Sequence, residues 1–133
     1  MVICDRNSLP ISVGVASASK HEITLVETTL AQRLTKQAPK LLVGDKAYDS
    51  DPHDKRVREN FGTELIAPHR KGRVRAKTQD GRKLRRYKRR WKVERFNAWI
   101  QNYKRIVTRY ERHLHNYLAM VQFACILILL RNW

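Results

Sequence analysis

The spacing of apolar residues in the first third of the chain predicts two strands followed by a helix. Residues 2–5 ("VICD") form a short apolar run, and residues 11–17 ("ISVGVAS") alternate in the way typical of a β-strand. Residues 6–10 ("RNSLP") contain Asn, Ser and Pro, so a turn is expected to join the two strands. Residues 22–36 then carry apolar side chains at intervals of three and four, the last at Leu34, which predicts a helix.

The middle of the chain predicts two more strands, one on each side of a second helix. Residues 40–45 ("KLLVGD") hold an apolar run without alternation, which indicates a short, fully buried strand. An Asp-Pro pair supplies a cap and a first helical position, so we expect a helix over 51–61. Residues 63–69 ("TELIAPH") predict the next strand, which their proline stops.

The remaining half predicts a basic loop and two helices. About residues 69–83 contain two glycines and show no apolar period, which is typical of a loop or a disordered arm. Residues 84–112 return to helical spacing, with Val107 and Tyr110 at the end of the apolar side, and 114–131 form a last, strongly apolar helix. The order of elements predicts one mixed α/β domain over residues 1–133, with helices available to cover a sheet.

The charge balance changes the expected class of partner. The 133 residues include 28 Lys and Arg but only 12 Asp and Glu, a formal charge of +16. Such a charge opposes a compact fold unless a polyanion neutralises it, with nucleic acid as first candidate and anionic membrane as second. The most apolar stretch, 118–130, is shorter than the roughly 20 residues of a spanning helix, so we expect it to be buried in protein. The N-terminus lacks a signal-peptide pattern, which predicts a cytoplasmic protein.

Metal sites built from cysteine are not indicated. Cys4 and Cys125 are the two cysteines of the chain, and neither belongs to a C-x-x-C pair. A disulfide framework and a structural zinc site are therefore both unexpected.

One acidic residue stands inside a strongly basic stretch, 87–101 ("YKRRWKVERFNAWIQ"). On a helix, Tyr87, Arg90, Glu94 and Gln101 fall within one sector of about 60°, because their offsets nearly close on whole turns. The simplest interpretation of Glu94 is an exposed ion pair with Arg90, worth a few tenths of a kcal/mol.

A second carboxylate makes a metal site an alternative. Asp45 closes a predicted strand, and ligands of open α/β sheets bind at the carboxyl ends of strands. An Asp in this position is most often a turn former or a helix cap, but Asp49 and Asp51 are better placed for those local roles. Asp45 and Glu94 together would suit Mg²⁺ or Mn²⁺ at a phosphodiester, and we expect them to face each other across the sheet's carboxyl end.

The string Tyr87-x-x-Arg90-x-x-x-Glu94 resembles the tyrosine–arginine–glutamate signature of DDE-type transposases of bacterial insertion sequences, of the insertion-sequence four/five superfamily. The segments "VICDRNSLPISVGVASASKHE" and "LLVGDKAYDS" resemble further parts of the same family, in order from about Val2 to the C-terminus. The resemblance implies an RNase H-like fold that cuts and joins DNA with Mg²⁺ held by two Asp and one Glu. It makes Asp45 and Glu94 the catalytic metal ligands, implies a place near the bacterial nucleoid, and allows a homodimer.

Two positions depart from the family pattern. Gln101 stands where the signature usually ends in lysine, and the family's first catalytic Asp lies on a strand before "VICD", whereas this chain begins at Met1. We therefore expect a partial domain without its first, central strand, either a truncated copy or one product of a split frame that needs an upstream-encoded half. Asp5 is not an obvious substitute, because it precedes the predicted turn. The isolated chain is expected to be inactive; the alternatives are a non-catalytic basic DNA-binding remnant and a ribosomal-type RNA-binding protein.

Half of the basic residues lie in one short segment. Residues 70–95 hold 14 of the 28 Lys and Arg residues, opposed by Asp80 and Glu94. A solvated charge run is the alternative, but this concentration favours contacts to DNA phosphates. An exposed Trp91 could stack on unpaired bases, while core packing is the stronger expectation for Trp99. The predicted DNA-binding residues are Lys46, Arg85, Arg86, Tyr87, Arg89, Arg90 and Trp91.

Overall fold

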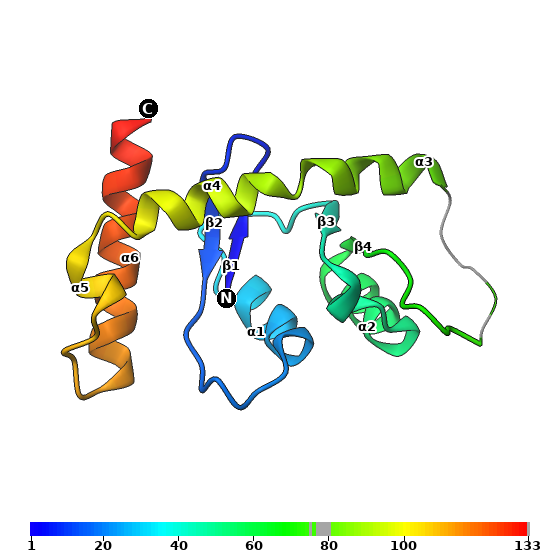
Figure 1. Cartoon of the computed structure of the whole chain (residues 1–133), viewed down its shortest axis with the longest axis horizontal. Helices are drawn as coiled ribbons and strands as arrows, with labels where there is room; N and C mark the ends of the chain where they lie inside the picture. Colours follow the sequence, from blue (N-terminus) through cyan, green and yellow to red (C-terminus); the bar gives the residue numbers. More distant parts are fainter. Residues whose placement is uncertain (75, 77–80, 133) are drawn as a thin grey trace.

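The computed structural model describes residues 1–74, 76 and 81–132, and shows a mixed α/β arrangement of short strands and several helices (Figure 1). The strands and helices of the first half are β1 (Val2–Cys4), β2 (Pro10–Val13), η1 (Glu22–Leu25), α1 (Val26–Ala31), β3 (Leu41–Val43), η2 (Lys46–Tyr48), α2 (Asp51–Phe61) and β4 (Glu64–Ile66). The second half contains α3 (Gly81–Leu84), η3 (Arg85–Arg89), α4 (Trp91–Ile100), α5 (Lys104–Val107) and α6 (Leu114–Arg131).

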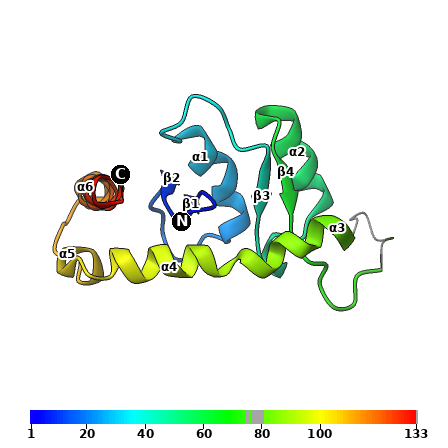
Figure 2. The same cartoon turned by 90° about the horizontal axis from the view of Figure 1, so that it is seen from above.

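The four strands form two separate pairs among the residues described. β1 and β2 pair antiparallel, with Val2 opposite Val13, and β3 and β4 pair parallel, with Leu42 opposite Leu65. Both views place the strands side by side in the order β2, β1, β3, β4, with α1 and α2 on one face and the α3–η3–α4 rod across the other (Figures 1 and 2). The arrangement is that of one layer of strands between two layers of helices.

Two apolar clusters hold these layers together. One joins Ile3 of β1 to Val26 and Leu30 of α1 and to Val57 of α2. The other lies on the opposite face of the β1–β2 pair, where Phe96 of α4, only 1% exposed, packs with residues of β2 and α6. Alternate residues of a strand point to opposite faces, so the β1–β2 pair contributes side chains to both clusters.

Several sequence predictions are confirmed. The turn between the first two strands is built by Asp5, whose Oδ1 accepts the N–H groups of Asn7 at 2.7 Å and Leu9 at 2.8 Å. The helices predicted over 51–61 and 114–131 have those bounds, although Ser50 rather than Asp51 is the cap residue of α2.

The helix predicted over 22–36 is wrong in its last third. It ends at Ala31, and Leu34 is 61% exposed because its N–H leaves the helical pattern and donates to the carbonyl of Ile11 at 2.9 Å. The strand predicted as fully buried, β3, is only half-buried along its length. One of its edges has no neighbouring strand among the described residues.

The long helix predicted over 84–112 is broken. The rod begins at Gly81, inside the predicted loop, and α4 ends at Ile100. Tyr103 is extended, which turns α5 back against α6, where the Tyr117 hydroxyl donates to the carbonyl of Ile106 at 2.8 Å. Val107 and Tyr110, predicted on the apolar side, are 63% and 72% exposed because the chain no longer follows that helical face.

Only one face of α6 is buried, which corrects the prediction of a helix enclosed by protein. Val121, Ala124, Cys125 and Ile128 are buried, whereas Phe123 is 55% and Leu130 is 67% exposed. By length and composition alone α6 would be able to cross a membrane. That criterion is weak for a single helix, since core helices also meet it, and α6 packs its buried face against β2, α4 and α5.

Candidate functional site

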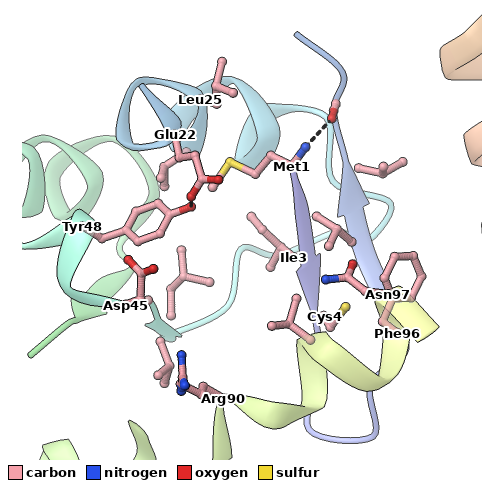
Figure 3. A pocket seen from close by; sticks show the side chains of 18 of the residues that line it. Met1, Ile3, Cys4, Glu22, Leu25, Asp45, Tyr48, Arg90, Phe96 and Asn97 are labelled. Carbon is pink, nitrogen blue, oxygen red and sulfur yellow. Dashed lines mark hydrogen bonds between the residues drawn. The ribbon is translucent and has the colours of Figure 1, made fainter. Parts of the chain in front are cut away.

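A cleft of about 990 Å³ opens between the two strand pairs. Residues of β1 and β3 line two sides of the cleft, and residues of η1–α1 and of α4 line two others. In Figure 3, Asp45 and Arg90 lie on one side of this space and Ile3 and Cys4 of β1 on the other. Apolar lining residues include Ile3, Leu25, Val26, Leu42, Val93 and Phe96.

In the described part of the chain, the strands on both sides of the cleft present unpaired edges to it. Met1 and Gly14 exchange hydrogen bonds of 2.8 and 2.9 Å, so the alternation of an antiparallel pair turns the backbone groups of Val2 away from β2. In the parallel pair, Gly44 donates to the Ile66 carbonyl, which leaves the backbone groups of Val43 directed away from β4. Unpaired edges of this kind are templates for another strand.

Asp45 lies on the cleft directly after β3 and is exposed. Its Oδ1 accepts the N–H of Ala47 at 2.7 Å, so Asp45 caps the short helix η2. The assignment of local capping to Asp49 and Asp51 was therefore wrong, because both carboxylates instead pair with Arg73. Capping uses one oxygen of Asp45 and fixes the direction of the carboxylate.

Glu94 lies in the first turn of α4 and lines the same cleft. Its Oε1 is 4.0 Å from the Arg90 guanidinium, and its side chain is 61% exposed, so this ion pair contributes little stability. The Arg90 guanidinium also lies 5.4 Å from the centre of the Tyr87 ring. The helical spacing thus predicted the contacts between Tyr87, Arg90 and Glu94 correctly, and Gln101 is the exposed cap residue at the end of α4.

The two carboxylates would need a further ligand to hold a metal ion firmly. Carboxylate oxygens suit Mg²⁺ and Mn²⁺, and Asp45 and Glu94 share one cleft. Among the described residues, however, no three His, Cys, Asp or Glu side chains come together as a metal-binding group.

Basic and acidic side chains both line this cleft. The exposed side chains of Arg86, Arg89 and Arg90 line it from the η3–α4 part of the rod. Arg85 and Lys46 are also exposed. Positions 75 and 77–80 of the predicted basic loop lie outside the described residues. The charged residues along the cleft are Asp5, Arg6, Lys20, Glu22, Asp45, Arg86, Arg89, Arg90, Lys92 and Glu94.

The two tryptophans of the rod differ in exposure. Trp91 is 45% exposed, with the Arg95 guanidinium 4.5 Å from its ring centre. Trp99 is half-buried and packs against the cluster around Phe96, which confirms the preference for core packing. Trp91 is therefore the one of these two that can stack on a base.

A buried ionic cluster next to Asp45 was missed from the sequence. The Asp49 carboxylate, 4% exposed, lies 2.9 Å from His69 Nδ1 and accepts from Arg73 at 2.8 Å. Burial by itself would raise the Asp49 pKa, but the Arg70 N–H, His69 and Arg73 together lower it. Polar residues that follow two parallel strands were the available signal, because the carboxyl ends of such strands meet.

Asp54 of α2 should destabilise the protein at neutral pH. Burial, helped by nearby Asp51 and Asp49, raises the pKa of Asp54 to about 6, and its Oδ1 is buried without a hydrogen-bond partner. Stability associated with the neutral carboxyl is therefore lost as the pH rises toward and through 6. Asp54→Asn is expected to increase the free energy of unfolding at pH 7 by about 1 kcal/mol, after allowance for solvent screening and the α2 amino terminus.

Urea unfolding of both proteins at pH 4 and pH 7 measures this effect. The difference should be present at pH 7 and much smaller at pH 4, where Asp54 is neutral in the folded protein. Lower stability of the Asn variant at pH 7 would contradict the account. Asp51→Asn is the matched comparison and should destabilise, because Asp51 accepts from Arg73 at 2.7 Å.

Comparison with known proteins gives two matches. A family described as "Transposase DDE domain" matches residues 1–129. The "Putative transposase for insertion sequence element IS402" of Burkholderia cepacia is 27% identical over 135 residues, which cover 96% of this chain. The chain spans only about 60% of the length of that relative. No solved structure matches significantly.

Proposed function

Because the chain belongs to the transposase DDE domain family, we propose that it forms part of an RNase H-like catalytic domain for metal-dependent DNA cleavage and strand transfer. The observation that carries this proposal is the cleft itself. Asp45 and Glu94 line it together with arginines of the rod, which supports a site where the proposed metal-ligating oxygens lie near the proposed phosphate-binding groups. DNA is the proposed partner, and a non-catalytic DNA-binding remnant is the alternative.

Asp45 and Glu94 are the proposed ligands of Mg²⁺ or Mn²⁺. The ion, when bound, would polarise phosphoryl oxygens and lower the pKa of an attacking water. The chain's own groups have separate tasks: Asp45, fixed by its cap to η2, supplies an oxygen from the strand layer, and Glu94 supplies one from α4. Arg90, held over the Tyr87 ring, is placed to bind a phosphate beside them.

The unpaired edges on both sides of the cleft support an RNase H-like sheet with one strand more. A strand lying in the cleft would pair with both edges and bury alternate side chains against α1 and α4. If it ran parallel to β3, its carboxyl end would lie beside Asp45. We propose that the third carboxylate of the site comes from that end, on a segment supplied by the same protein or by a separately encoded half.

A second copy of the chain is the other proposed partner. The segment 114–130 contains no Lys, Arg, Asp or Glu, and its exposed residues on α6 include Phe123 and Leu130. Two copies of a chain with a formal charge of +16 would approach most easily there, so the proposed homodimer uses α6. Binding to DNA would place the protein at the bacterial nucleoid.

A Mn²⁺ titration followed by nuclear magnetic resonance tests the site. Amide signals near Asp45 and Glu94 are expected to broaden together at millimolar Mn²⁺, because two ligands bind weakly. Asp45→Asn keeps the cap, since an amide oxygen still accepts the Ala47 N–H, but should abolish the broadening at both positions. Glu94→Gln should do the same, and Glu59→Gln on exposed α2 should leave it unchanged. DNA binding without any Mn²⁺ effect would favour the non-catalytic remnant.

A further inference from the structure

Arg70 and Arg73, the first two arginines of the basic segment 70–95, form hydrogen bonds with groups of the protein itself. The Arg70 N–H donates to Asp49 Oδ2 at 2.8 Å. Its guanidinium donates from Nε to the Lys46 carbonyl at 3.0 Å and from Nη2 to the Ala47 carbonyl at 2.7 Å. Arg70 thereby closes the carbonyl end of η2, the short helix whose amino end is capped by Asp45.

Arg73 is more enclosed than Arg70, which is exposed. Its side chain is 12% exposed, and it donates from Nη1 to Asp49 at 2.8 Å. From Nη2 it donates to both oxygens of Asp51, at 2.7 and 2.8 Å. The positive charge is thus compensated by two carboxylates, which leaves little to offer a phosphate.

The turn that carries Asp45 is consequently fixed at three points. Asp45 Oδ1 holds the Ala47 N–H, Arg70 holds the following carbonyls, and the Tyr48 hydroxyl donates to Glu22 at 3.0 Å. A two-carbonyl contact requires the planar fork of arginine, because a lysine ammonium is a single point charge. Removal of Arg70 would therefore take away one of these three contacts without touching Asp45 itself.

We propose that Arg70 and Arg73 form a latch, in which Arg70 positions Asp45 and Arg73 holds the carboxylates of Asp49 and Asp51, and that neither arginine is a DNA contact. The DNA phosphates are bound instead by exposed arginines of the rod, such as Arg89. The strongly basic segment 70–95 would then contain one part that positions Asp45 and another part that binds DNA phosphates. It rests on the proposed function only where Asp45 is treated as a metal ligand.

Three variants separate the two parts: Arg70→Gln, Arg73→Gln and, as matched control, Arg89→Gln. One measurement is the slope of log affinity against log salt for a DNA duplex. That slope should become less steep by about 0.9 in the Arg89 variant and stay unchanged in the other two. The second measurement is hydrogen exchange of the Ala47 amide, which should accelerate about tenfold or more when Arg70 is replaced and stay constant when Arg89 is replaced.

The third measurement is Mn²⁺ affinity at Asp45, from the same broadening experiment. Arg70→Gln should weaken it about tenfold, as expected for a group that orients a metal ligand. Arg70→Lys keeps the charge but not the fork, so it should restore the affinity only in part. Full restoration by Lys would show that charge alone suffices and would overturn the positioning role.

Other results would also overturn the latch. A slope lowered by about 0.9 in the Arg70 or Arg73 variant would make that residue a DNA contact. Unchanged Ala47 exchange in Arg70→Gln would remove the connection to Asp45. If the Arg73 variant does not fold, Arg70→Lys and Arg70→Gln still decide the question. Absence of Mn²⁺ binding in the unaltered protein would contradict the proposed metal site instead, and the salt slope and amide exchange would still judge the latch.

Discussion

Replacement of Arg85, Arg86, Arg89 and Arg90 by Gln together is expected to weaken DNA binding by about 10³- to 10⁴-fold at 0.1 M salt. All four side chains are exposed on η3 and the start of α4, and three of them line the cleft. Each phosphate contact contributes about 0.9 to the slope of log affinity against log salt, so loss of four should flatten that slope by about 3.6. A duplex-binding titration at several salt concentrations measures both quantities.

A control is needed for the general loss of positive charge. Replacement of Lys104, Arg105, Arg109 and Arg112 by Gln removes the same charge from exposed residues that do not line the cleft. This control should change the slope little. Equal losses in both variants would indicate nonspecific attraction by net charge rather than a binding face. Equal affinity for an RNA hairpin and a DNA duplex would favour the RNA-binding alternative.

Elements whose signals are local were predicted well. The bounds of α2 follow from the Asp-Pro pair at its start and from Gly62, which leaves the helix with φ = +64°. The bounds of α6 follow from 18 residues with a strongly apolar pattern. Both signals lie inside the element or at its ends, so no distant contact was needed to interpret them.

Elements set by distant contacts were predicted poorly. The apolar spacing continues through Val107 and Tyr110, but the chain turns at Tyr103 so that α5 contacts α6. That turn depends on packing between segments, and a helical period along the sequence carries no information about it. The same holds for Leu34, whose backbone pairs with Ile11 rather than continuing α1.

The candidate site shows the same division. The contacts of Tyr87, Arg90 and Glu94 were predictable because positions three and four apart are neighbours on a helix. The partners of Asp49 have no such local signal, since they lie 20 or more residues away and are brought near by the β3–β4 pairing. As a result the capping role of Asp45 was given to Asp49 and Asp51 instead.

Strand cleavage and transfer are expected to require a segment that fills the cleft. With Asp45 and Glu94 as its two proposed ligands, the chain alone should show little or no cleavage of end-containing DNA, because two metal ions about 3.5–4 Å apart are expected to need a bridging carboxylate. A strand segment ending in Asp, fused ahead of Met1 or added as a separate chain, should restore activity. The same segment ending in Asn should restore the sheet, measured as increased thermal stability, but not the reaction.

In the restored protein, Asp45→Asn or Glu94→Gln should reduce cleavage by about 10³-fold or more, since loss of a ligand removes several kcal/mol of metal-dependent stabilisation. DNA affinity should remain, because the proposed DNA contacts are the arginines of the rod. Arg90→Ala should weaken placement of DNA while metal binding persists. Robust cleavage by the 133-residue chain alone would refute this account and require a third ligand from Asp5 or Asp49. Both already have other roles: Asp5 Oδ1 accepts two backbone N–H groups, and Asp49 is buried with His69 and Arg73.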